Sequence, residues 1–203
     1  MSVEILTKVM KKLFLPLILL AAFHAGAAAQ DKRIEEIQRI YQEIGRKIGD
    51  AEKAFAMSKR EGGIAETEIF LSEMQFNKGN TSYPAVGIFR EDTKFYFTFK
   101  SGAPYPERLL KIVTITYRSA AVEHREYLFD AAGQLIFYFE DPDSENMDRS
   151  EETRLYFAGG KLIRFQVGDD VSTNNPIFRR KNEIAQEVLE KQKKIVNVLK
   201  NSV

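Results

Sequence analysis

His124 is the residue of this sequence best suited to proton transfer near neutral pH. The sequence holds two histidines, and the other, His24, lies in an apolar N-terminal segment. His124 alternates with charged residues in Val122-Glu-His-Arg-Glu126, a segment with the pattern of a strand. The count excludes a three-histidine zinc site, and a Ser-His-Asp triad would have to use His124. We therefore expect His124 to be a surface residue that pairs with charges on its own strand.

The acidic run from Glu140 to Asp148 is the best candidate for a metal site. Three of its acids alternate as the first ligands of a calcium-binding loop do: Asp141, Asp143 and Glu145. The sixth position, where such loops carry Gly, is Asn146, and Glu152 stands at the twelfth. Although Asn can adopt the left-handed backbone, the missing Gly favours a solvated loop. We expect no bound metal and no cofactor.

Carboxylates elsewhere give a third kind of chemistry. A pair of acids about 5–10 Å apart can hydrolyse a glycosidic bond, and Glu66, Glu68 and Glu73 are available besides the acidic run. The sequence contains no Gly-x-Ser-x-Gly, His-Glu-x-x-His or Gly-x-x-x-x-Gly-Lys motif. A hydrolase that uses surface carboxylates is therefore one alternative, and a non-catalytic role is favoured.

The N-terminal segment has the composition of a secretory signal peptide. Three lysines precede the apolar run Leu13–Phe23, and small residues follow in Ala25-Gly-Ala-Ala-Ala29. The apolar run is shorter than the ~20 residues that a membrane-spanning helix needs. We expect residues 1–29 to be cleaved, with no membrane span afterwards and a mature protein in the periplasm or outside the cell.

This cleavage has a direct test. The intact mass of the exported protein should match a chain that begins at Gln30, because signal peptidase cuts after small residues such as Ala29. The variant Ala29→Tyr should keep its leader. A mature protein that retains Leu13–Phe23 would contradict the expectation.

Removal of the leader leaves a nearly neutral chain. It takes three of the 30 basic residues and one of the 29 acidic residues, so 27 positive and 28 negative charges remain with His uncharged. A protein dedicated to nucleic acid or to anionic membrane carries a basic field, and none is expected here. The absence of cysteine excludes thiol chemistry, thiolate metal sites and lipid attachment at a Cys.

Two amphipathic helices are expected, one at each end of the mature chain. In the first, over residues 31–57, apolar residues recur at helical spacing: Ile34, Ile37, Ile40, Tyr41, Ile44, Ile48, Ala51 and Phe55. In the second, over residues 176–201, the stripe comprises Ile184, Val188, Ile195, Val198 and Leu199. We expect both stripes to pack on the protein's own sheet, since tertiary packing stabilises most helices.

Residues 66–168, between the helices, have the alternation and turn residues of an antiparallel meander. The first strands are expected at 66–77, 85–89, 94–100 and 109–118, with Arg90-Glu-Asp-Thr93 as a connection between two of them. Phe95, Phe97 and Phe99 share one face of their strand. The sequence thus predicts one α+β domain over 30–203, with an N-terminal helix, an antiparallel β-meander of about seven or eight strands, and a C-terminal helix.

Two similar hairpins close the meander. Tyr127-Leu-Phe-Asp-Ala-Ala-Gly-Gln-Leu-Ile-Phe137 is echoed by Leu155-Tyr-Phe-Ala-Gly-Gly-Lys-Leu-Ile-Arg-Phe165. Their turns predict four cross-strand pairs: Phe129 with Leu135, Tyr127 with Phe137, Phe157 with Leu162, and Tyr156 with Ile163. The hairpins resemble the tyrosine-rich YD and MORN-type β-meander repeats of secreted bacterial proteins. The resemblance covers only these hairpins, implies a meander and carries no catalytic residues.

Both faces of the first hairpin are apolar, so both need a cover. Strict alternation places Tyr127, Phe129, Leu135, Phe137 and Phe139 on one face, and Leu128, Ile136 and Tyr138 on the other. Aromatic residues are enriched at interfaces, so we expect a ligand or partner surface built from them. The candidates are Tyr96, Tyr138, Tyr156, Phe97 and Phe137.

These features favour an exported, non-catalytic binding or interaction protein of the bacterial cell envelope. Its partner would be another envelope or secreted protein. The alternative is a periplasmic carrier that holds a lipid or another apolar small molecule in a cavity of the curved sheet. Five phenylalanines distinguish the interaction protein from the carrier: they would touch a helix in the first and line an empty space in the second. They are Phe95, Phe97, Phe99, Phe137 and Phe139.

Overall fold

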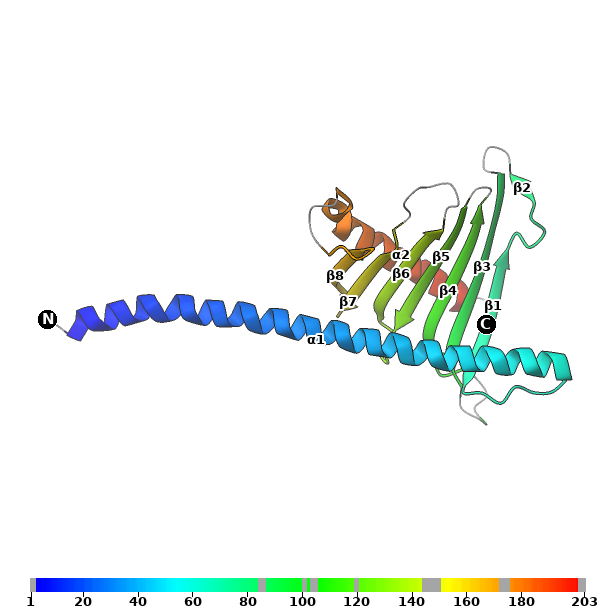
Figure 1. The fold of residues 1–203 in the computed structure, drawn as a ribbon, viewed down its shortest axis with the longest axis horizontal. Coiled ribbons are helices and arrows are strands. Elements are labelled where there is room, and N and C mark those ends of the chain that lie inside the picture. Colours follow the sequence, from blue (N-terminus) through cyan, green and yellow to red (C-terminus); the bar gives the residue numbers. More distant parts are fainter. Residues whose placement is uncertain are drawn as a thin grey trace.

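The computed structural model describes residues 3–83, 87–99, 102, 106–118, 121–143, 151–171 and 176–200, with side chains from residue 29 on except those of Tyr83, Ile88, Asp143 and Lys200. A long helix, α1 (Val3–Glu61), precedes an antiparallel sheet, and a short 3-10 helix, η1 (Pro176–Arg180), leads into the C-terminal helix α2 (Lys181–Lys200). The two long helices lie on opposite faces of the sheet (Figure 1). The predicted α+β arrangement is confirmed.

The strands follow one another across the sheet in chain order, apart from one short addition. Their bounds are β1 (Ile69–Phe76), β2 (Ser82–Tyr83), β3 (Gly87–Thr98), β4 (Arg108–Arg118), β5 (Ala121–Phe129), β6 (Leu135–Asp143), β7 (Thr153–Ala158) and β8 (Lys161–Val167). The order is β1-β3-β4-β5-β6-β7-β8, every pairing is antiparallel, and β2 pairs with β3. The described strands therefore form a meander.

Strand β3 is longer than the sequence predicts. Arg90-Glu-Asp-Thr93, expected as a connection, lies within the strand and pairs with β1 and β4. The polar side chains find partners across the sheet: Thr116 Oγ1 donates to Glu91 Oε2 at 3.2 Å, and the Thr93 and Thr114 hydroxyls are 3.3 Å apart. A run of polar residues does not break a strand when neighbouring strands satisfy it.

The apolar stripe of α1 packs on one face of the sheet, as expected. Ile34, Ile37, Ile44, Ile48 and Ala51 are buried there, and Ile40, Tyr41 and Phe55 are partly buried beside them. The sheet contributes a set of buried residues from several strands: Ile69, Tyr96, Leu110, Leu128, Ile136, Phe137 and Tyr156. The helix crosses the end of the sheet where the β5–β6 and β7–β8 turns lie (Figure 1).

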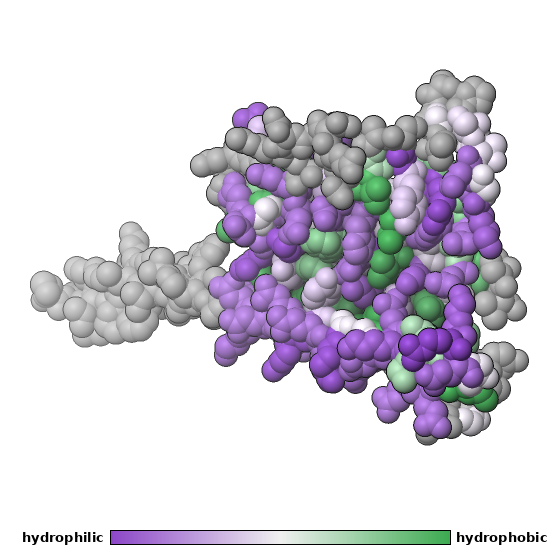
Figure 2. Space-filling model, turned by 45° about the vertical axis from the view of Figure 1, so that its right-hand side comes forward, coloured by the Kyte–Doolittle hydropathy of each residue, from purple (hydrophilic) through white to green (hydrophobic). Residues whose placement is uncertain are grey.

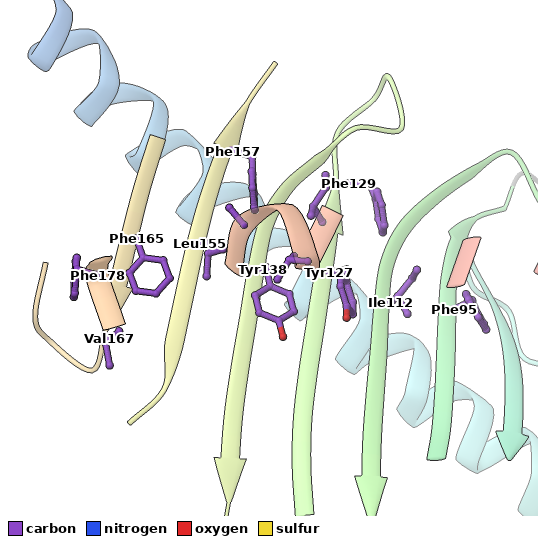
Figure 3. Packing of buried hydrophobic residues seen from close by; sticks show 13 residues of the cluster. Phe95, Ile112, Tyr127, Phe129, Tyr138, Leu155, Phe157, Phe165, Val167 and Phe178 are labelled. Carbon is purple, nitrogen blue, oxygen red and sulfur yellow. The ribbon is translucent and has the colours of Figure 1, made fainter. Parts of the chain in front are cut away.

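The opposite face forms a second core under η1 and α2 (Figure 3). Its fully buried residues include Tyr127, Leu155 and Phe157, and α2 adds Ala185 and Val188. The rings of Phe165 and Phe178 meet edge to face with centroids 5.0 Å apart, which fixes η1 against the last strand. Val198, expected within the α2 stripe, is exposed instead.

Three β-bulges change which residues face which helix. In each of the pairs β3–β4, β5–β6 and β7–β8 the register shifts near the connection, so that one residue of the later strand has no partner: Leu110, Ile136 and Ile163. The predicted pairs Phe129–Leu135 and Phe157–Leu162 are confirmed. The next pairs are wrong, since Tyr127 pairs with Tyr138 and Tyr156 with Arg164.

The face assignment in the first hairpin is corrected accordingly. Phe137 and Phe139 lie toward α1, whereas Tyr138 lies toward α2 with Tyr127. A bulge puts two residues opposite one and so reverses the alternation that follows it.

Gly160 adopts a φ of 73°, which a β-branched residue strongly disfavours. Substituting Gly160→Val should therefore lower the free energy of unfolding by about 1–3 kcal/mol. The space around its Cβ position is open, so the effect would come from the backbone and not from a clash. Urea unfolding measures it. Gly49→Ala is the control, because this helical site is also open and Ala stabilises a helix by up to about 1 kcal/mol.

Candidate functional site

The five aromatic residues predicted as a contact surface do not come together. Tyr96, Tyr138, Tyr156 and Phe137 are each exposed by 4% or less, and Phe97 is partly buried. Tyr96, Tyr156 and Phe137 lie under α1, whereas Tyr138 and Phe97 lie on the α2 face. A role of these residues in binding stays a prediction.

A buried carboxylate joins α1 to the middle of the sheet. Glu126 Oε2 accepts a hydrogen bond from Tyr41 Oη at 2.6 Å and lies 2.8 Å from Lys111 Nζ. His124 Nε2 lies 3.2 Å from Glu126 Oε1. The Lys111 ammonium also sits 4.8 Å from the centre of the Tyr41 ring. Lys111 and Glu126 are exposed by only 7% and 8%, so this ion pair is shielded from water.

The neighbours of Glu126 decide its protonation. Burial alone raises the pKa of this carboxyl, but the adjacent His124 imidazole, the charge of Lys111 and the Tyr41 hydroxyl together lower the pKa to about 2. Burial, reinforced by the hydrogen bond to Glu126, raises the pKa of Tyr41 above its usual range. At neutral pH the carboxylate is charged and its oxygens are already engaged. The cluster is therefore an anchor for α1.

A second anchor lies further along α1. Glu52 Oε1 accepts from Lys94 Nζ at 2.8 Å and from Tyr96 Oη at 2.6 Å. Burial raises the pKa of Tyr96, and the contact with Glu52 raises it further. Gln38 donates to the Tyr156 hydroxyl at 3.3 Å. Two of the predicted surface tyrosines thus use their hydroxyls to hold the helix.

The α2 face has its own buried ionic cluster. Arg125 Nε donates to Glu140 Oε1 at 2.8 Å, its Nη1 donates to Thr116 Oγ1 at 3.2 Å, and it also pairs with Glu123. Burial and the nearby charge of Arg125 lower the pKa of Lys191 on α2, against the opposing effect of the surrounding glutamates. Positive and negative groups are matched here, which suits a structural role.

On the sheet face that packs against α1, the part of the sheet beyond the helix is not covered by either long helix (Figure 1). Register places four apolar residues there, which we call the open sheet patch: Val113, Ile115, Val122 and Phe139. Val122 is 37% exposed, and the others are partly exposed. Figure 2 shows apolar residues in a hollow above α1, framed by hydrophilic ones. A cavity of about 180 Å³ adjoins the patch between β1, β3 and β4.

Paired charges flank this patch. The Arg90 guanidinium lies 4.6 Å from the centre of the Tyr117 ring, and its Nε donates to Asp92 at 3.0 Å. The Arg154 guanidinium lies 5.6 Å from the centre of the Phe139 ring and pairs with Glu152. The patch therefore has an apolar centre with a polar, charge-balanced margin.

The described residues that were predicted to do chemistry do not gather in one site. His124 is half exposed on β5, and its ring meets Phe139 edge to face. Asp141 lies opposite His124 in β6, the side chain of Asp143 and all of Glu145 fall outside the described residues, and Glu68 and Glu73 line different cavities. Within the described part of the chain, no three His, Cys, Asp or Glu side chains are close enough to share a metal ion.

A groove of about 580 Å³, which the sequence does not predict, lies between α1 and the turn edge of the sheet. Its α1 wall is formed by Arg33, Glu36, Ile40, Glu43, Ile44 and Lys47. Its sheet wall is formed by Glu68, Ile69, Thr98, Phe99, Arg108, Leu110 and the turn residues Phe129, Asp130, Ala131 and Ala132. No local motif marks it, because it forms where a helix meets strands distant in sequence.

In the part of the chain that the structure describes, no helix is both long enough and apolar enough to cross a membrane. No protein-family model, curated protein or solved structure matches this chain.

Proposed function

We propose that the chain is an exported, non-catalytic interaction protein of the bacterial cell envelope, which binds another envelope or secreted protein through the open sheet patch. One observation carries this proposal. Ile115 and Val122 lie outside the α1 core, with Val113 and Phe139 partly buried at its margin, although the rest of that face is packed under the helix. An apolar surface exposed in this way favours contact with a partner.

The margin of the patch supports a protein as the partner. Interfaces between proteins combine an apolar centre with a polar rim and are enriched in arginine and aromatic residues. Arg90 over Tyr117 and Arg154 over Phe139 have this character. Each arginine is already neutralised by an acid, which gives little attraction to a polyanion.

The packing of the phenylalanines also favours a contact surface, rather than a cavity inside the sheet, as the binding site. Phe95 and Phe137 are buried in the two cores, and Phe97 and Phe139 pack against them. Phe99 lines the groove beside the turns. The carrier alternative is therefore kept only for that groove, whose volume lies within the ~300–1,000 Å³ typical of ligand pockets.

Site-specific photocrosslinking in the native host tests the proposal. A benzophenone amino acid at Ile115, in the patch, should give one discrete protein adduct. The same amino acid at the exposed Val171 is the matched control and should give none. Val122→Asp should abolish the Ile115 adduct without loss of thermal stability, because a charge at a partly exposed interface site opposes docking and not folding. Equal adducts from both positions, or an adduct unaffected by Val122→Asp, would refute the proposal.

A further inference from the structure

We propose that the groove between α1 and the turn edge binds an amphipathic monocarboxylate, with its apolar chain along the groove and its carboxylate on Arg108. The groove lies toward the turn edge, across α1 from the open sheet patch. The inference therefore goes beyond the protein partner proposed above and can fail or succeed independently.

The floor of the groove suits an apolar chain. Ile44, Ile69, Leu110 and Phe129 belong to the buried cores, and Ile40 is partly buried beside them. An apolar floor with few polar groups is typical of a small-molecule site, and the groove volume of about 580 Å³ is in the usual range.

Arg108 is the polar group that singles out an anion. Its Nε is buried without a hydrogen-bond partner, and its guanidinium forms no ion pair with any described residue. The other two cations of the groove are already engaged: Arg33 with Glu36 at 2.7 Å, and Lys47 with Glu43 at 3.1 Å. The Nε atom is shielded from solvent, so the terminal N–H groups of the guanidinium are the ones that a ligand in the groove would contact, and a carboxylate matches their planar geometry.

The acids of the groove limit the charge of the ligand. Glu36, Glu43, Glu68 and Asp130 all line it. Asp130 Oδ1 is held by the backbone N–H groups of Ala132 and Gln134, both at 2.9 Å, so this carboxylate is fixed in the turn. A second negative charge on the ligand would be repelled by these groups, which favours a carboxylate over a phosphate monoester.

Isothermal titration calorimetry of the protein purified from its own compartment, with dodecanoate below its micelle concentration, tests the site. Dodecanoate should bind, whereas acetate should not, and dodecyltrimethylammonium should bind at least tenfold more weakly. Dodecyl phosphate should also bind more weakly than dodecanoate. Tighter binding of dodecyl phosphate would overturn the assignment of the head group, and no binding of dodecanoate would overturn the site.

Two variants locate the binding. Arg108→Gln should weaken dodecanoate binding tenfold or more, because it removes the only cation of the groove that no described acid pairs. Arg33→Gln removes a cation from the same groove that is already paired, and should change the affinity less than threefold. Equal effects of the two substitutions would refute the role of Arg108.

A third variant keeps the inference testable if Arg108→Gln unfolds the protein. Ala132 is exposed in the β5–β6 turn and lines the groove, so Ala132→Trp should be tolerated and should obstruct the groove. Dodecanoate affinity should fall tenfold or more while the thermal melting curve stays unchanged. A folded Ala132→Trp protein with wild-type affinity would place the ligand elsewhere and refute the proposal.

Discussion

Replacing Glu126 by Leu should lower the free energy of unfolding by about 3–5 kcal/mol. The substitution leaves the Lys111 ammonium buried without its counter-charge, which was 2.8 Å away. It also leaves the Tyr41 hydroxyl without its acceptor. Removing one partner of a buried pair costs far more than the pair contributes, because the remaining charge cannot be solvated. Urea unfolding followed by far-UV circular dichroism measures the loss.

The double variant Lys111→Met with Glu126→Leu is the informative control. Removing both charges should restore most of the lost stability, since apolar residues can replace a buried pair at little net cost. Glu43→Gln is the surface control. Its pair with Lys47 is largely exposed, so the change should stay below about 0.5 kcal/mol. A double variant as unstable as Glu126→Leu would show that the charges do not act as a pair.

The same pair predicts an acid transition. The pKa of Glu126 is about 2 in the folded protein and about 4.3 in an unfolded chain, so its stabilisation is fully present above about pH 5. It is lost as the pH falls from about 4 to about 2, and it amounts to about 3 kcal/mol. The double variant should show a shallower decrease in stability over this range. An identical acid profile would contradict the lowered pKa.

Sequence periodicity predicts the elements of this fold well and the contacts between them less well. The apolar stripe of α1 lies on the sheet as its spacing requires. The pairing next to each hairpin turn is also as expected, because turn geometry fixes it. The bulges at Ile136 and Ile163 are not encoded in the period-two pattern. They put Phe137 under α1 and Tyr138 under α2.

The candidate sites show a second limit of prediction from sequence. An aromatic residue has the same pattern whether it faces a partner or a helix of its own chain, so Tyr96 and Tyr156 could not be distinguished from surface residues. What separates them from the open sheet patch is the length of sheet that α1 covers. That length follows from where the helix crosses the strands, and no local sequence signal specifies a crossing point. The groove beside Arg108 has the same origin.

Replacing Phe157 by Ala should also lower the free energy of unfolding by about 3–5 kcal/mol. Phe157 is fully buried in the core under α2, and the truncation removes most of an aromatic ring without a rearrangement able to fill its place (Figure 3). A domain of this kind is stable by only about 5–15 kcal/mol, so the variant should be marginally folded. Phe76→Ala is the matched control. This residue is 53% exposed on β1 and should cost less than about 1 kcal/mol.

The way in which the Phe157→Ala protein unfolds is as informative as the size of the loss. The sheet is shared by both cores, so weakening the α2 core should destabilise the α1 core by the same amount. The chain has 8 tyrosines and no tryptophan, and tyrosine fluorescence reports on both faces, where Tyr127 and Tyr96 are buried. Urea curves from fluorescence and from far-UV circular dichroism should coincide in one transition. Two separate transitions would mean that α1 and α2 stabilise independent halves, and the single-domain interpretation would then be wrong.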